Sequence, residues 1–139
     1  MEVRPAFRLL CGSCPYKHIH MLASVAALPS RALAQLFKAL GDETRLRMVA
    51  LLSQGDLCGC HLQQALDLSQ PNTSRHLGVL RAAGMVTDRR VGGWVYYALA
   101  PQSGERKRLL AALVRGFSQA TLRADVARLT ASRGALSCK

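Results

Sequence analysis

The chain has 139 residues, half of them apolar, and carries 19 Lys and Arg against 8 Asp and Glu, for a formal charge of +11. This length suits one compact domain with short tails, and the charge favours a polyanionic partner such as nucleic acid or an anionic membrane surface. No apolar run approaches the roughly 20 residues that a spanning helix needs, which excludes a transmembrane segment.

The cysteines bear on the cellular compartment. Neither RLLCG (8–12) nor MLASVAAL (21–28) has the layout of an export signal, so we expect a cytoplasmic protein. Five cysteines in a reducing compartment indicate metal or redox chemistry rather than a structural disulfide set. Met21 is an alternative start, and with that start Cys11 and Cys14 would not be made.

The first third of the chain contains an irregular arm and then two helices. Residues 1–29 hold three prolines and few periodic positions, which is typical of an arm without regular structure. A helix is expected over 31–40, with Ser30 as its N-cap and Gly41 as its stop. A second helix is expected over 43–53.

The middle of the chain has the outline of a helix-turn-helix. A short helix is expected over 59–66, followed by a three-residue turn at 67–69 and a helix over 70–83. Ser69 is the expected cap of the latter helix, and Gly84 is expected to end it. A short helix, a tight turn and a second helix with a polar leading end are typical of this DNA-binding motif.

The rest of the chain predicts a hairpin and a further helix. The β-rich runs MVTDRR and WVYYALA flank VGG, which indicates a hairpin with a glycine turn. Helical periodicity returns over 103–132, where a stripe is too apolar for a helix left in water. We expect this stripe to meet a partner subunit; it contains Leu109, Leu110, Leu113, Val114 and Phe117.

These elements predict a mainly α-helical fold with a small β-hairpin (α+β), a winged helix-turn-helix that forms a homodimer. The expected domains are an arm at 1–29 with Cys11 and Cys14, a DNA-binding domain at 30–100, and a dimerisation helix and tail at 101–139.

The helix over 70–83 carries side chains suited to DNA. With Leu77 and Leu80 on its buried side, the exposed side and leading end present amide, hydroxyl and guanidinium groups, which hydrogen-bond to base edges. Arginines of the hairpin lie where a wing would contact phosphate. The predicted DNA-binding residues are Gln70, Asn72, Thr73, Ser74, Arg75, His76, Arg89 and Arg90. The alternative, a solvated face without function, agrees less well with the basic charge.

Cys58 and Cys60 flank one glycine at the start of the expected 59–66 helix. Within a regular helix such a pair lies about 200° apart, with β-carbons roughly 7 Å from each other, and is unable to hold one ion. At the helix start the backbone is not yet helical, and Gly59 adds freedom, so the two sulfurs can converge. The helix N-terminus also favours thiolate, the form that binds soft ions.

The position of this pair suggests a switch. A ligand at Cys58 and Cys60 would distort or stiffen the first turn of the 59–66 helix. Only three residues join that helix to the DNA-binding helix, so the change would shift the DNA-binding helix as well. Cys11 and Cys14 form a C-x-x-C that favours a metal-binding arm, because no thioredoxin-like pattern surrounds it. Cys138 is a further thiol near the end, and the histidines at 18, 20 and 61 are borderline ligands.

Four segments resemble the arsenical-resistance repressors of the ArsR/SmtB family: LFKALGDETRLRMVALL, DLCGC, LSQPNTSRHLGVLRAAGMV and GGWVYYAL. The resemblance covers about residues 31–100. It implies a dimeric winged helix-turn-helix repressor that leaves operator DNA on binding a metal or metalloid, with the first and last helices forming the dimer. Such a protein is not an enzyme, and no nucleophile with a general base is visible in the sequence.

The resemblance leaves the inducer open between two ligand classes. Arsenical sensors often have a third cysteine after the pair, but here that position, near Gln63, is not cysteine. For As(III) or Sb(III), which we favour as inducer, the third thiolate must be Cys11, Cys14 or Cys138. Alternatively, the arm cysteines and the pair give four thiolates suited to Cd(II) or Pb(II). A repressor that senses oxidation of the pair is a third possibility. The expected partner is operator DNA with an inverted repeat, and no membrane.

Overall fold

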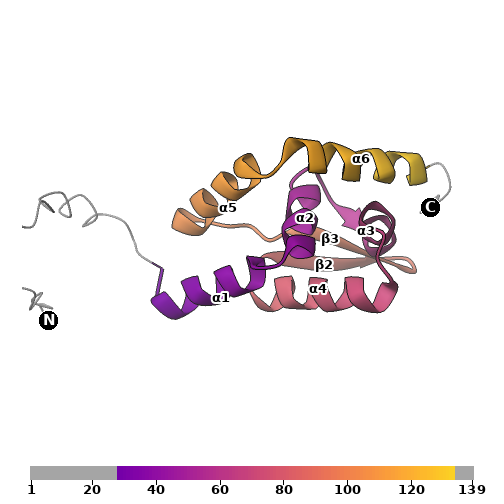
Figure 1. Ribbon diagram of the computed structural model, residues 1–139. Coiled ribbons are helices and arrows are strands. Elements are labelled where there is room, and N and C mark those ends of the chain that lie inside the picture. The colour runs from indigo at the N-terminus through magenta and orange to yellow at the C-terminus, as the bar shows by residue number, and fades with distance from the viewer. Residues whose placement is uncertain (1–27, 134–139) are drawn as a thin grey trace, which may run out of the picture.

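A computed structural model describes residues 28–133 (Figure 1). In Figure 1, α4 runs along one side of the molecule and α5 and α6 along the opposite side, with α2 and the sheet between them. None of the helices in this described part is long and apolar enough to cross a membrane. The elements, in chain order, are α1 (Ser30–Leu40), α2 (Glu43–Leu52), β1 (Leu57–Cys58), α3 (Gly59–Leu66), α4 (Gln70–Ala82), β2 (Val86–Val91), β3 (Trp94–Leu99), α5 (Gly104–Gly116) and α6 (Gln119–Arg133).

The helix boundaries follow local capping. Asp42 caps α2 because its side chain accepts a hydrogen bond from the Arg45 amide at 3.0 Å. The expected cap of α1 is wrong by one residue: Pro29 occupies the N-cap and Ser30 is already helical, without a side-chain cap bond. Ser69 is confirmed as the N-cap residue of α4, with its carbonyl accepting from the Thr73 amide at 3.0 Å.

The sheet is antiparallel, with strand order β1-β3-β2. Strands β2 and β3 form the predicted hairpin, in which Val91 pairs with Trp94 across a turn where Gly92 has φ +59°. Glycine suits that left-handed backbone because it has no β-carbon. The two-residue strand β1, which pairs Cys58 with Tyr96, was not predicted from the sequence.

One hydrophobic core joins the helices to the sheet. Its largest fully buried side chains come from four elements and from the residue that precedes β2, so the helix-turn-helix and the wing pack as one unit. The buried side of α4 is the predicted one. These core residues include Met48, Leu51, Leu62, Leu77, Leu80 and Met85.

The expected single helix over 103–132 is wrong. It divides into α5 and α6 at Phe117, whose backbone is extended (φ −68°, ψ 142°) and whose ring packs against the core. Ser118 precedes α6 and caps its first turn, because its hydroxyl accepts a hydrogen bond from the Thr121 amide at 3.4 Å. Gly116 before the break weakens the helix there.

A buried carboxylate ties α6 to the other helices. Asp125 is fully buried and accepts two hydrogen bonds from Arg47 of α2, at 2.9 and 2.6 Å, and one from Arg128. Arg128 also donates to the Ala65 carbonyl of α3 at 2.8 Å. The hydrogen bonds that Arg47 donates to Asp125 raise the pKa of Arg47 above its ordinary value, so the guanidinium stays charged. The C-terminal helix is thus fixed to the helix that carries the thiols.

Candidate ligand site and nucleic-acid interface

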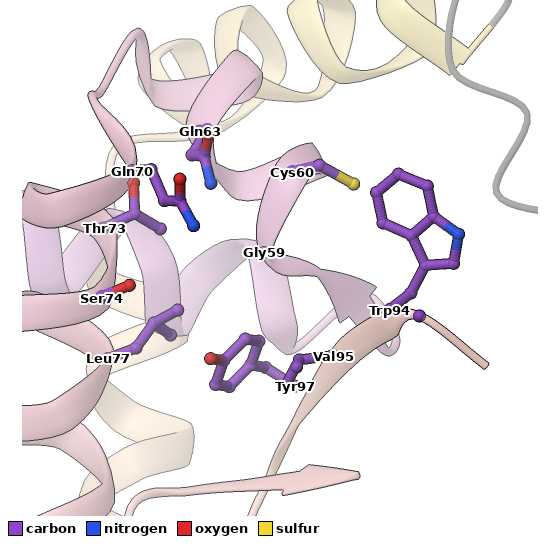
Figure 2. A pocket seen from close by; sticks show the side chains of 11 residues that line it. Gly59, Cys60, Gln63, Gln70, Thr73, Ser74, Leu77, Trp94, Val95 and Tyr97 are labelled. Carbon is purple, nitrogen blue, oxygen red and sulfur yellow. The ribbon is translucent and has the colours of Figure 1, made fainter. Parts of the chain in front are cut away.

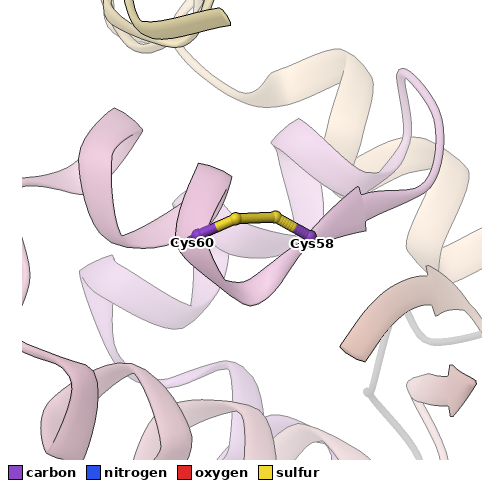
Figure 3. Close-up of a disulfide and its surroundings, with 2 residues drawn as sticks. All are labelled: Cys58 and Cys60. Carbon is purple, nitrogen blue, oxygen red and sulfur yellow. A yellow bond between two sulfur atoms is a disulfide. The ribbon is translucent and has the colours of Figure 1, made fainter. Parts of the chain in front are cut away.

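The two cysteines meet at the start of α3, as their positions predict. Cys58 is the N-cap residue, with an extended backbone (φ −73°, ψ 158°), and Gly59 and Cys60 begin the helix. Their α-carbons lie 5.4 Å apart, and the two sulfurs are joined in a disulfide (Figure 3). An extended N-cap brings the pair within bonding reach, and the pair is in the oxidised form, which is the state that the redox alternative of the sequence analysis requires.

The two sulfurs differ in their surroundings. Cys58, which lies in β1, is fully buried, whereas Cys60 is half-buried and lines a hollow of about 290 Å³ (Figure 2). In Figure 2 the Cys60 side chain extends toward the indole of Trp94, at the start of β3. A ligand that reaches the pair through this hollow therefore approaches Cys60 first.

A third candidate donor, an imidazole, lies beside the two sulfurs. His61 is buried, and one ligand atom each from Cys58, Cys60 and His61 lie within 4.8 Å of one another. Sulfur and imidazole nitrogen together suit soft and borderline cations. The other predicted ligands, Cys11, Cys14 and Cys138, lie outside the described residues, so their positions relative to the pair stay predictions.

Most of the predicted base-contacting side chains lie together on α4. The side chains at the leading end of the helix are exposed, on the face opposite the buried Leu77 and Leu80. This leading end follows α3 after the three-residue turn, where Asp67 adopts a left-handed backbone (φ 53°). The exposed set consists of Gln70, Asn72, Ser74 and Arg75.

Two predicted contacts lie elsewhere. Thr73 is 2% exposed, and its hydroxyl donates to the Ser69 carbonyl at 3.0 Å. The expectation that Thr73 contacts DNA is therefore corrected: this side chain packs inward at the first turn of α4. His76 is half-buried and its Nδ1 lies 3.5 Å from an Asp42 carboxylate oxygen, which places it at the contact between α4 and α2.

The wing presents two exposed arginines. The Arg89 guanidinium lies 5.5 Å from the ring centroid of Tyr96 and 3.2 Å from the Asp56 carboxylate. The ring helps to orient the guanidinium, and the carboxylate partly neutralises its charge. Arg90, next along β2, is exposed. The two guanidinium groups give the hairpin the positive charge that a phosphate contact needs.

Comparison with known proteins gives the family. Residues 42–88 match the family described as "Bacterial regulatory protein, arsR family". A solved structure of HlyU from Vibrio cholerae is 33% identical, with a TM-score of 0.58, and the match covers 65% of this chain and 93% of that one. The chain belongs to the ArsR family. This membership supports the expectation of a regulator rather than an enzyme.

Two further relatives of this ArsR-family chain bear on its function and on its fold. The arsenical resistance operon repressor of Escherichia coli is 59% identical over 68 residues, which cover 48% of this chain and 58% of the relative. The chain thus matches little more than half the length of that repressor. A winged helix-turn-helix domain of Mycobacterium bovis, described as homodimeric and DNA-binding, is 28% identical with a TM-score of 0.54; the match covers 64% and 86% of the two chains. The predicted fold is confirmed.

Proposed function

We propose that this chain is a homodimeric transcriptional repressor that binds operator DNA with an inverted repeat and leaves it on capturing As(III) or Sb(III). The protein acts in the cytoplasm, where the DNA is. In this account α4 contacts bases in the major groove and the wing contacts the phosphate backbone. Strong positive charge supports such a partner, and it makes the affinity depend on salt through counterion release.

One observation carries the proposal: the cysteine pair begins the helix that leads directly into α4. A ligand held by Cys58 and Cys60 sits at the N-terminus of α3, which has eight residues. A turn of three residues joins the end of α3 to α4, the helix that contacts DNA in this proposal. A change in the first turn of α3 is therefore passed to α4 without an intermediate element. Since β1 pairs Cys58 with Tyr96, the same change also reaches the wing.

Trivalent arsenic and antimony supply the inducer in this proposal. The name of the Escherichia coli relative supports the arsenical choice. A third thiolate comes from Cys11, Cys14 or Cys138, in the same subunit or in its partner. The alternative inducers are Cd(II) and Pb(II), held by Cys11, Cys14, Cys58 and Cys60. A cadmium resistance regulator from Staphylococcus aureus, 39% identical over 67 residues, supports that alternative.

A second candidate function is redox sensing by the same pair. The observation that favours it is the Cys58–Cys60 disulfide itself. Oxidation of two thiols to this disulfide releases two electrons and two protons to an oxidant: hydrogen peroxide is reduced to two waters, and an organic hydroperoxide to an alcohol and one water. In that case the disulfide form is the one that differs in DNA affinity.

One titration separates the three possibilities. The full chain, reduced with a phosphine, is bound to a fluorescent operator and titrated separately with arsenite, Cd(II) and peroxide, while anisotropy reports release from DNA. We expect release with arsenite near one equivalent per site. Release by cadmium alone or by peroxide alone would overturn the arsenical choice and support the corresponding alternative.

The dimer in this proposal uses α1 and α5. Phe37 is 56% exposed and Leu109 is 36% exposed, and both line one apolar hollow together with Leu33. Exposed apolar side chains gathered from two helices are typical of an association surface. This surface includes part of the predicted 109–117 stripe, although the inner side of that stripe packs on the chain's own core.

A further inference from the structure

An apolar side chain interrupts the polar outer face of α4. Val79 is 38% exposed, one of the large apolar side chains that the described part of the chain leaves in contact with solvent. It comes four residues after Arg75 and seven after Asn72, and helical spacing puts these three on one side of α4. The helix packs on the core through Leu77 and Leu80 instead. Val79 therefore belongs to the surface that would face base edges.

Nothing in the described residues accounts for a valine at this position. Valine is a weaker helix former than alanine, and a half-exposed side chain gains little from packing. A β-carbon built on the neighbouring Gly78 would meet no atom within 4 Å from other parts of the described chain, so the surface beside Val79 is open. Single exposed apolar side chains are common, but this one lies where a partner outside the chain approaches.

The major groove offers one apolar group to such a side chain. Base edges there present nitrogen and oxygen donors and acceptors, together with the 5-methyl group of thymine. Phosphates are charged and favour basic or hydrogen-bonding side chains. A valine placed against a polar base edge would leave that edge without its hydrogen bonds, which is unfavourable. The thymine methyl is thus the group of the groove that matches Val79.

We propose that Val79 contacts the 5-methyl group of a thymine in each operator half-site and so contributes to sequence specificity. This inference rests on the proposed function and deepens it, because it assigns the kind of base that α4 prefers at one position. Arg75 selects by hydrogen bonds, whereas Val79 selects by apolar contact.

The helix geometry also gives the position of this thymine. Val79 lies about 6 Å further along α4 than Arg75, because an α-helix rises about 1.5 Å per residue. Successive base pairs are about 3.4 Å apart. For a helix that follows the groove, the thymine is therefore expected about two base pairs from the base pair that Arg75 contacts.

Removal of a single methyl group from the DNA tests the contact. The reduced full chain first selects its operator from a library of random-sequence duplexes. The selected duplex is then synthesised with each thymine in turn replaced by deoxyuridine, which lacks only the 5-methyl group. Fluorescence anisotropy measures each affinity. We expect a thymine in each half-site at which this replacement weakens binding about fourfold, the effect of exposing one methylene-sized group.

A variant of the protein assigns that effect to Val79. Val79→Ala should bind the unmodified operator about fourfold more weakly per half-site. It should also bind the thymine and deoxyuridine duplexes equally at the assigned position, a result that a purely structural role of Val79 does not give. Alanine favours helix, so the variant should fold, and circular dichroism checks this. The control is Val91→Ala, an exposed valine of the wing, which should keep the full sensitivity to deoxyuridine.

The outcomes separate this inference from the proposed function. The inference is overturned, and the repressor remains, if no single deoxyuridine weakens wild-type binding or if Val79→Ala keeps the wild-type sensitivity. A monomeric Val79→Ala protein in sedimentation velocity would place Val79 in a subunit contact and overturn it as well. Failure to select any sequence would overturn operator binding and this inference together. Sensitivity to deoxyuridine without release by arsenite would uphold the contact and refute the proposed switch.

Discussion

The DNA contacts proposed for side chains on α4 and on the wing differ in kind. Arg75 is exposed at the leading end of α4, where a guanidinium can donate two hydrogen bonds to a guanine edge. Arg90 is exposed on β2, in a position suited to phosphate. A base contact contributes to sequence preference, whereas a phosphate contact contributes to overall affinity and to its salt dependence.

Substitution of these two arginines should separate the two contributions. Arg75→Ala is expected to weaken operator binding by about 1–3 kcal/mol and to relax the preference for the operator over other DNA. Arg90→Ala is expected to weaken binding to all sequences alike and to lower the slope of log affinity against log salt by about 1. Fluorescence anisotropy at several salt concentrations measures both, with Arg123→Ala, an exposed arginine of α6, as the control. An equal loss on all sequences from Arg75→Ala would contradict the assignment.

The sequence predicted the exposed residues of α4 but not which polar residues turn inward. Helical spacing from Leu77 and Leu80 places Asn72 and Arg75 outward, as found. Thr73 is four residues before Leu77, on the buried side, and its inward packing was available from that same spacing. The position of His76 could not be predicted from local spacing, because it depends on Asp42, 34 positions earlier in the sequence, which only tertiary packing brings close.

At the scale of elements, Asp125 links α6 to the helix that holds the cysteines. The sequence contains a signal for this residue, because Leu122, Asp125, Val126 and Leu129 share one helical face. A carboxylate inside an apolar stripe is expected to have a buried partner. That the partners are Arg47 and Arg128 depends on the packing of α2 against α6, which no local pattern gives.

Removal of this carboxylate should destabilise the fold. Asp125→Asn retains the side-chain size but leaves Arg47 without its counter-charge, so we expect the free energy of unfolding to fall by about 3 kcal/mol. This value is at the lower end for a broken buried pair, because Arg47 and Arg128 keep some contact with water. Urea denaturation followed by circular dichroism measures it.

Two comparisons complete that test. Arg108→Ala removes an exposed ion pair with Glu105 and should change stability little. The contribution of Arg47 to the free energy of unfolding should also be constant across neutral pH. Because the pKa of Arg47 is raised in the folded protein, this stabilisation is complete below the ordinary arginine pKa. It is lost only as pH rises through the pKa of Arg47 in the folded state. If the Asp125→Asn protein had the same free energy of unfolding as the wild type, the stabilising role assigned to the hydrogen bonds of Asp125 would be contradicted.

The elements themselves were predicted to within one residue wherever caps and turns are local. The helices α3 and α4 and the glycine turn of the wing follow from residues next to them in sequence. Two errors have other causes: β1 is too short to have a pattern and exists because it pairs with β3, and the break at Phe117 occurs where that ring turns into the core. Gly116 followed by Ser118, a stop and then a cap, was the local signal for this break.

For the whole molecule, the proposed dimer accounts for the apolar surface of α1 and α5. Phe37→Glu places a charge on this surface and should shift the protein to a monomer, because a buried interface does not accept an unpaired carboxylate. Sedimentation velocity measures the mass. Operator affinity should fall as well, since one subunit contacts one half-site.

A matched control is available on the wing. Val91 is 48% exposed, close to the 56% of Phe37, and lies on β2. Val91→Glu should leave the mass of the dimer unchanged. A dimeric Phe37→Glu protein, or a monomeric Val91→Glu protein, would place the interface elsewhere.

The central claim is that a ligand on the cysteine pair releases the whole molecule from DNA. The most direct test compares the reduced wild-type chain with its Cys58→Ser, Cys60→Ser variant on a fluorescent operator while arsenite is added. The account predicts that both bind the operator with similar affinity, and that arsenite releases the wild type while the variant stays bound. A variant that still leaves the operator on arsenite addition would contradict the account.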